Sequence, residues 1–187
     1  MVYLGLLEAP RGVQTVLDGM MIARAQGVAA KLDIIGDGRD RGLLEQQCRE
    51  LGFTEADVTF HGFLPYDEAL RHVQESDVGL VPHLPNDSWN STIPNKLFDY
   101  MSMGMPVISS DARPAARIVT ETGAGAVHAG GDAEGFARSM QAVASATRRV
   151  EMGLAGRTAV INRYNWSVDG QVVVGALEGL TEGLVRL

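Results

Sequence analysis

Hydrophobic residues gather in six short runs along the chain, and each run is nearly continuous in apolar character. The runs cover residues 2–7, 31–36, 58–62, 78–81, 106–110 and 125–129. Short continuous apolar runs are typical of parallel strands, because other structure covers such strands on both faces. The pattern therefore predicts six buried β-strands.

Between these runs, hydrophobic residues recur three and four positions apart, which is the spacing of one helix face. Four such stripes are Val13, Val16, Leu17 and Met20; Leu44, Cys48 and Leu51; Ala69, Leu70 and Val73; and Phe136, Met140, Val143 and Ala144. Asp132 precedes the fourth stripe as a predicted N-cap. Because strands and helices alternate at this interval, the chain is predicted to form right-handed crossover units in a doubly wound α/β sheet.

The C-terminal segment follows a different pattern. After Trp166 the hydrophobic residues Val173, Leu177, Leu180 and Leu184 indicate a terminal helix that no strand follows. We therefore expect a doubly wound domain over residues 1–165 and a separate helix over 166–187.

Composition narrows the class of protein. The 187 residues are 45% hydrophobic and 21% charged, which is a globular composition. A net charge of −7 argues against nucleic-acid binding, which would require a basic surface. The single cysteine, Cys48, favours a reducing compartment. Because the start lacks a signal-peptide pattern and no apolar stretch approaches about 18 residues, we expect a soluble cytoplasmic domain.

Ligands of doubly wound sheets bind beyond the carboxyl ends of the strands, so the loops after the strands hold the candidate residues. The strongest segment is STIPNKLFDYMSMGMPVI, residues 91–108. Pro94 suits the first turn of a helix, and the free amides of Asn95 and Lys96 would then form a cradle for phosphate. The positive charge of Lys96 strengthens this prediction of an anion site.

Asp99 lies three residues after Lys96, so the sequence predicts that both side chains share one outward face of this helix. A carboxylate accepts two hydrogen bonds side by side, which suits the vicinal hydroxyls of a ribose. The alternative is an ion pair between the two side chains, worth a few tenths of a kcal/mol. Spacing alone does not separate these interpretations.

Two other loops carry weaker signals. Gly36 and Gly38 follow a strand in IIGDGRDR, but Arg41 stands where a dinucleotide fingerprint needs a third glycine. The two glycines therefore serve either a close ligand approach or a tight strand-to-helix turn. Arg11, in PRGV before a helix, either faces an anion at the helix N-terminus or is simply solvated.

The histidines and one tryptophan complete the candidates. His61 and His83 lie near strand ends within reach of a ligand, whereas His72 and His128 are interpreted as surface or packing residues. None has a partner at the spacing of a catalytic triad or metal site, so no metal is predicted. Trp89 lies in an irregular loop and is a lid, an acceptor contact or an anchor for a neighbouring domain.

Taken together, the segments resemble the donor-binding, C-terminal half of a GT-B glycosyltransferase, most closely family 4, or group 1. The matching segments are YLGLLEAPRGVQTVL, LDIIGDG, VTFHGFLPYDEAL, SDVGLVP, PNKLFDYMSMGMPVISSD and RYNW. Any one of them is weak evidence, but six in the family order over almost the whole chain are strong. The resemblance implies a Rossmann-like, six-stranded parallel sheet with helices on both faces and a nucleotide-diphosphate sugar at its carboxyl edge.

The resemblance also implies roles for individual residues. The diphosphate would be bound by Arg11, Asn95 and Lys96, the ribose by Asp99, the base by Gly62, Phe63 and Leu64, and the sugar by Ser91, Thr92 and Ile93. The chain departs from the family pattern at two positions, because Ser91 replaces a glutamate and Leu6 replaces an arginine of the diphosphate-binding pair. Lys96 stands where it compensates for the charge lost at Leu6.

The implied activity is retaining, metal-independent glycosyl transfer from a UDP-, GDP- or ADP-sugar, without a cofactor, in polysaccharide or glycolipid assembly. Family members have a preceding acceptor domain, so this chain alone is expected to be inactive, with the helix over 166–187 packing towards that domain. Any peripheral membrane contact would come through the missing domain. The alternatives are a sugar-nucleotide epimerase of the same architecture, a non-catalytic nucleotide-binding module and a dinucleotide oxidoreductase.

Overall fold

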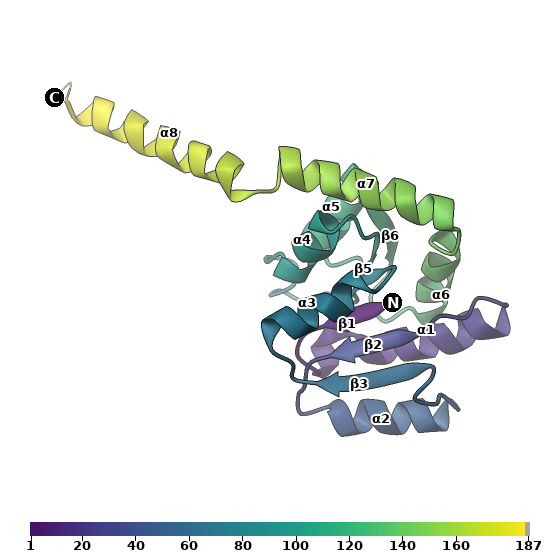
Figure 1. Ribbon diagram of the computed structural model, residues 1–187. Helices are drawn as coiled ribbons and strands as arrows, with labels where there is room; N and C mark the ends of the chain where they lie inside the picture. The colour runs from purple at the N-terminus through teal and green to yellow at the C-terminus, as the bar shows by residue number, and fades with distance from the viewer. Residues whose placement is uncertain (186–187) are drawn as a thin grey trace.

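In a computed structural model of the chain, residues 1–185 are described, with side chains as far as Glu178 (Figure 1). Six strands form one sheet in the order β3-β2-β1-β4-β5-β6, and every neighbouring pair is parallel. The strands are β1 Val2–Leu4, β2 Leu32–Ile35, β3 Val58–Gly62, β4 Gly79–Val81, β5 Val107–Ser110 and β6 Gly125–His128. The predicted doubly wound sheet is confirmed, and its strand order reverses between β1 and β4.

Helices cover both faces of this sheet. They are η1 Ala9–Arg11, α1 Val13–Ala25, α2 Arg41–Glu50, α3 Tyr66–Gln74, α4 Asn95–Ser102, α5 Arg113–Thr122, α6 Ala133–Ala142, α7 Ala146–Asn162 and α8 Trp166–Val185. Helices α1, α2 and α6 contribute to the hydrophobic core on one face, and α3, α4 and α5 contribute to the core on the other. Successive strand residues serve opposite faces, since Tyr3 enters the first core and Val2 the second.

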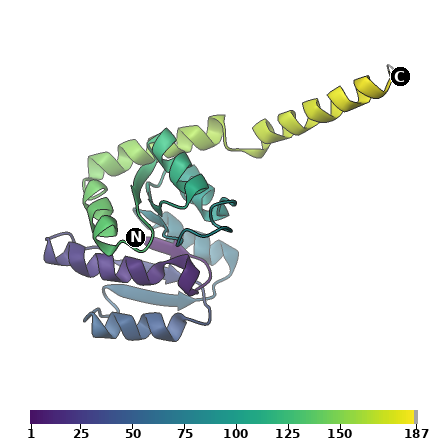
Figure 2. The same cartoon turned by 180° about the vertical axis from the view of Figure 1, so that it is seen from behind.

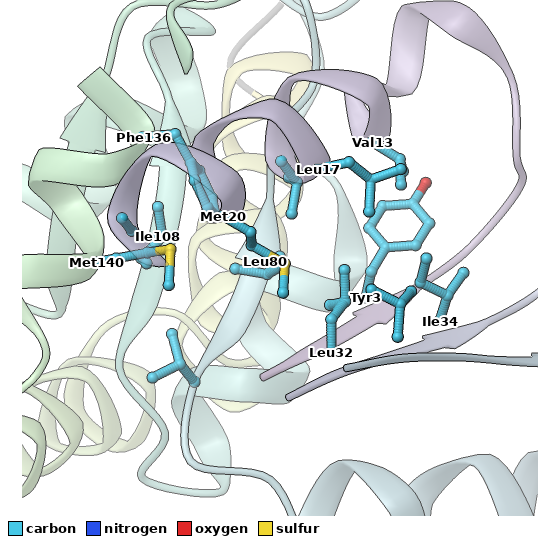
Figure 3. Close-up of a cluster of buried hydrophobic side chains, with 14 of the residues drawn as sticks. Tyr3, Val13, Leu17, Met20, Leu32, Ile34, Leu80, Ile108, Phe136 and Met140 are labelled. Carbon is cyan, nitrogen blue, oxygen red and sulfur yellow. The ribbon is translucent and has the colours of Figure 1, made fainter. Parts of the chain in front are cut away.

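The first core is centred on α1, α6 and the middle strands. Figure 3 shows Leu17 and Met20 of α1 facing Leu80 of β4, with Phe136 of α6 beside them. Gly19 permits this approach, because a Cβ there would lie 3 Å or less from atoms of Phe136 and Ala133. The stripe predicted for α1 is therefore the buried face of that helix.

Several boundaries differ from the sequence-based expectation, and the physical reasons are local. The first strand ends at Leu4 rather than at residue 7, because Gly5 adopts a φ of +147°. The amide of Leu7 then donates to the carbonyl oxygen of Asp37 in the next loop.

The N-cap predicted at Asp132 is confirmed, since its carboxylate accepts from the Gly135 amide at 2.9 Å.

Helix α8 projects away from the sheet in both views (Figures 1 and 2). Its side chains at Trp166, Val172, Val173, Val174 and Leu177 are 50–80% exposed. The terminal helix expected after Trp166 is present, although the side chains of Leu180 and Leu184 lie outside the described ones. Over residues 1–185, no helix has both the length and the apolar character required to cross a bilayer.

Candidate functional site

The loops after β1 and β4 meet at the point where the strand order reverses. Gly12 has a φ of +76°, and a Cβ at this position would collide with the carbonyl group of Pro82. The amide of Leu84 also donates to the carbonyl oxygen of Pro10 at 3.0 Å. These backbone contacts bring Arg11, from the first loop, beside His83, from the second.

Lys96 joins this region from helix α4. Its Nζ lies 4.2 Å from the centroid of the Tyr3 ring, and the residue is only 9% exposed. A Cβ at Gly5 would lie 2.9 Å from this nitrogen, so the glycine makes room for it. The Nζ atom has no hydrogen-bond partner among the described residues. Burial, assisted by the charge of Arg11, lowers the pKa of Lys96 to about 7.

The predicted placement of Lys96 is therefore wrong in one respect. The sequence predicted an outward side chain sharing a face with Asp99, whereas the lysine stem lies under the loop after β1. The cause is that Gly5 and the ring of Tyr3 provide a space that the amphipathic stem fills. Helix α4 also begins at Asn95, so Pro94 is its N-cap instead of part of its first turn.

Asp99 lies one turn further along α4 and is partly buried. Burial raises the pKa of its carboxyl group. Within residues 1–185, its side chain forms neither a hydrogen bond nor an ion pair, so the alternative of an Asp99–Lys96 pair is not formed. The carboxylate oxygens remain available as acceptors.

Helix α4 also presents free backbone donors. Its first backbone bond runs from the amide of Leu97 to the carbonyl oxygen of Pro94 at 3.0 Å. The amides of Asn95 and Lys96 precede that bond and donate to no described residue. These two amides and the partial positive charge of the helix N-terminus favour an anion at this position.

Two stacked rings, those of Trp89 and His83, lie beside Arg11. The Arg11 guanidinium carbon lies 4.5 Å from the centroid of the Trp89 ring, and the ring of Trp89 stacks on His83 at 4.0 Å with 15° between the planes. His83 is fully buried, and neither ring nitrogen has a partner among the described residues. Burial, followed by the charges of Lys96 and Arg11, lowers the pKa of His83 to about 3.

This stack resolves part of what the sequence left open. His83 was expected within reach of a ligand; it lies in the basic cluster formed by Arg11, His83 and Lys96, but its ring is fully buried and exposes no surface to a ligand. The sequence assigned Trp89 no partner, because the loop has no periodicity and its contacts join segments far apart in the chain. The sequence showed a histidine and a tryptophan in the same loop, but nothing in it predicted that the two rings stack.

The segment predicted to bind the sugar forms the turn that leads into α4. The hydroxyl of Ser91 donates to the carbonyl oxygen of Asp87 at 2.7 Å, and that of Thr92 donates to Ser88 at 2.9 Å. Both residues are exposed, as is Ile93 at 37%. This turn and the stack therefore belong to the same loop.

The segment predicted to bind the base lies further along the sheet. Gly62 is buried at the end of β3, Phe63 is 86% exposed, and Leu64 packs partly on the second core. Since β3 is the edge strand and β1 is a central one, this segment shares the carboxyl edge with Arg11 without contacting the basic cluster.

The two glycines after β2 are explained by packing. A Cβ at Gly36 would collide with the carbonyl group of Gly5, and one at Gly38 would collide with that of Leu7. Arg41, where a dinucleotide fingerprint needs glycine, bonds Asp37 and Glu45 instead. The glycines thus form a tight turn that supports the first loop, the structural one of the two interpretations.

The remaining candidates lie outside the basic cluster. His61 lies 2.8 Å from the carboxylate of Asp33 and packs on His72, whereas His128 packs edge-on against Phe136. Leu6 is 53% exposed, and its carbonyl oxygen accepts from the Tyr3 hydroxyl at 2.7 Å. Among the described residues, no group of three histidine, cysteine or acidic side chains is arranged to hold a metal.

Two hollows of the domain lie away from this site. One of about 340 Å³ and another of about 450 Å³ both include Asp77 and Arg149 in their walls. Asp77 precedes β4, so these hollows lie at the amino ends of the strands. The basic cluster instead lies at the carboxyl edge of the sheet.

Comparison with known proteins agrees with this architecture. Residues 1–146 match the family described as glycosyl transferases group 1. The amylovoran biosynthesis glycosyltransferase AmsK of Erwinia amylovora is 27% identical over 176 residues, which cover 93% of this chain and 43% of that protein. The chain therefore spans less than half the length of this relative.

Solved structures share the fold. The crystal structure of Anabaena Alr3699/HepE in complex with UDP has a TM-score of 0.81 at 17% identity, covering 95% of this chain and 48% of that one. The C-terminal domain of the group 1 protein LpcC from Francisella tularensis has a TM-score of 0.75 at 15% identity, covering 88% of this chain and 85% of that domain. These similarities show that the chain shares the fold of these domains.

Proposed function

Because this chain belongs to the group 1 glycosyl transferases, we propose that it forms the donor-binding half of an enzyme that transfers a sugar from a nucleoside diphosphate to an acceptor. The observation that most supports this proposal is the amino group of Lys96. It is buried beside Arg11 and His83 and has no hydrogen-bond partner among the described residues. A buried cation without a partner destabilises a fold, whereas a bound anion compensates for its charge. The free amides that begin α4 and the position at the carboxyl edge favour a diphosphate.

Each side chain then has a chemical role. As the bond between the sugar and the diphosphate breaks, negative charge grows on the departing phosphate oxygen. Arg11, the ammonium form of Lys96 and the amide of Asn95 stabilise that charge. Asp99 accepts hydrogen bonds from the ribose hydroxyls, and the base lies at residues 62–64. Ser91 offers the sugar a hydroxyl in place of a carboxylate.

The other half of the reaction belongs to residues outside this chain. The acceptor would bind a preceding domain, and α8 would pack towards it through the apolar side chains that it now exposes. We also propose that the transfer retains the configuration of the sugar, needs no metal ion, takes place in the cytoplasm and is not catalysed by this chain alone. AmsK is named for amylovoran biosynthesis and a second relative, Salmonella typhimurium WcaL, for colanic acid biosynthesis, which supports a role in polysaccharide assembly.

Calorimetric titration of the 187-residue chain with UDP, GDP and ADP tests the proposal. UDP is the first nucleotide to try, because the Anabaena structure contains it. We expect one nucleotide to bind and Asp99→Asn to weaken it by about tenfold or more, since a hydrogen bond to a charged group is worth about 1.5–3 kcal/mol.

Glu55→Gln is the matched control, because Glu55 is exposed and precedes the amino end of β3, whereas the proposed site lies at the carboxyl ends of the strands. Its affinity should equal that of the unmodified chain. Failure of all three nucleotides to bind would contradict the proposal, and equal loss in both variants would contradict the role of Asp99.

A further inference from the structure

The loop that leads into α4 holds an aromatic side chain against the one arginine of the basic cluster. Arg11 lies at the end of η1, and its guanidinium contacts the face of Trp89. Within residues 1–185, Arg11 forms no ion pair, so this cation–π contact is the interaction that orients its side chain. A guanidinium over a ring uses its flat face for the contact and keeps its N–H donors at its edge.

Trp89 is itself fixed from several directions. Its ring stacks on the buried ring of His83, so the indole contacts both a histidine and an arginine. Its amide donates to the side-chain oxygen of Asn86 at 2.9 Å. The side chain of Asn90 accepts from the Arg113 amide at 3.1 Å, which ties the same loop to α5.

The two neighbours of the Trp89 indole differ in burial and in charge. His83 is closed off from solvent and kept neutral by burial and by its cationic neighbours, so the indole rests on an uncharged base. The indole also contacts the guanidinium of Arg11, which is only partly buried and whose N–H groups bond no described residue. Trp89 thus links a buried, uncharged ring to a partly exposed, positively charged group.

We propose that Trp89 is a positioning residue for the donor diphosphate: held against His83, its indole fixes the Arg11 guanidinium with its N–H edge free for phosphate oxygens. This inference rests on the proposed function and adds to it a residue that has no direct contact with the nucleotide. An arginine ordered before binding loses less side-chain freedom when it binds, so the indole contributes to affinity through Arg11.

A double-mutant cycle tests this role. Trp89→Leu, Arg11→Ala and the double variant are titrated with the nucleoside diphosphate that binds most tightly. We expect Trp89→Leu to weaken binding by about three- to thirtyfold, the range of a cation–π contact. In the Arg11→Ala background, Trp89→Leu should have no further effect. Trp89→Phe keeps an aromatic face and should recover most of the affinity.

The full-length enzyme gives a second measurement. Trp89→Leu should raise the KM for the sugar nucleotide and leave the KM for the acceptor unchanged. Thermal unfolding of each variant verifies that it is folded, and Trp89→Met, which also removes the aromatic face, replaces Trp89→Leu in the cycle if Trp89→Leu does not fold.

The outcomes separate the two proposals. If no nucleotide binds the unmodified chain, the proposed function fails. A second case is that a nucleotide binds and Arg11→Ala weakens its binding. If Trp89→Leu then leaves the affinity unchanged, or lowers it by the same factor with and without Arg11, only the positioning role of Trp89 is overturned.

Discussion

At the scale of single residues, Lys96 combines two opposing requirements. Its stem fills the space between Tyr3 and Gly5, which favours a neutral amine. An anion at the same place favours the ammonium form. With a pKa of about 7, the side chain lies near the point where it can serve either state.

This balance predicts how stability depends on pH. The folded-state pKa of Lys96 is lowered from about 10.5 to about 7, so between these values the unfolded chain binds a proton that the folded chain does not. The free energy of unfolding should therefore rise with pH across this window, approaching about 1.4 kcal/mol per pH unit. Below pH 7 this dependence disappears, because both states are then protonated.

Urea unfolding of the nucleotide-free chain at pH 7 and pH 9 measures the effect. Lys96→Met, which keeps an apolar stem, should remove the extra rise, whereas Lys31→Met should retain it because Lys31 is exposed. An equal rise in the unmodified chain and in Lys96→Met would contradict the assignment.

At the scale of elements, the sequence predicted what depends on side-chain periodicity. All six strands were found, because parallel strands buried on both faces give continuous apolar runs. Over residues 1–185, two α-helices were missed. Helix α5 buries Ala115, Ile118 and Val119, a stripe that the sequence contains but that was not identified. Helix α7 was missed for a deeper reason, because two of the three residues it buries, Gly153 and Gly156, are glycines.

The candidate site was likewise predicted only in part. The spacing of Lys96 and Asp99 identified the helix that bears the site, but not the side on which the lysine lies. That side depends on the space above Gly5, a residue of another loop. The contact of Trp89 with Arg11 and His83 joins two loops in the same way, and no local pattern encodes it.

The close packing of α7 on α4 predicts an unusual effect of a helix-favouring substitution. A Cβ at Gly153 would collide with the carbonyl group of Gly104, a backbone atom that cannot rotate away. Gly153→Ala should therefore lower the free energy of unfolding by about 1–3 kcal/mol, the range of an overpacked site.

The same change at Gly42 of α2 is the matched control, because a Cβ there meets nothing within 4 Å. Gly42→Ala should leave stability unchanged or raise it by up to about 1 kcal/mol. Denaturant unfolding of both variants provides the comparison, and a stabilised Gly153→Ala chain would show that α7 is not packed as described.

At the scale of the whole molecule, one compact sheet domain carries a helix that leaves it. Trp166 is 80% exposed, and the apolar side chains of α8 between Val172 and Leu177 are at least half exposed (Figures 1 and 2). Such an unpartnered apolar face marks an interaction surface. In a chain that spans 43% of its relative AmsK, the rest of the protein is the proposed partner.

Removal of residues 166–187 should therefore have little effect on the sheet domain. We expect the midpoint of thermal unfolding to move by less than about 2 °C, because most of the described side chains of α8 are exposed and add little to the buried core. Nucleotide affinity should be unchanged. Circular dichroism and calorimetry provide the measurements, and a fall of more than about 5 °C would show that α8 is part of the folding unit.

The contact between Gly12 and Pro82 has a consequence for the site as a whole. It joins the loops of the two halves of the sheet through backbone atoms alone, so the distance between the arginine and the histidine is set during folding, before any ligand arrives. A side chain at position 12 would act as a wedge between these loops. The two side chains would then separate although each was still present, and the site would be lost through its spacing alone.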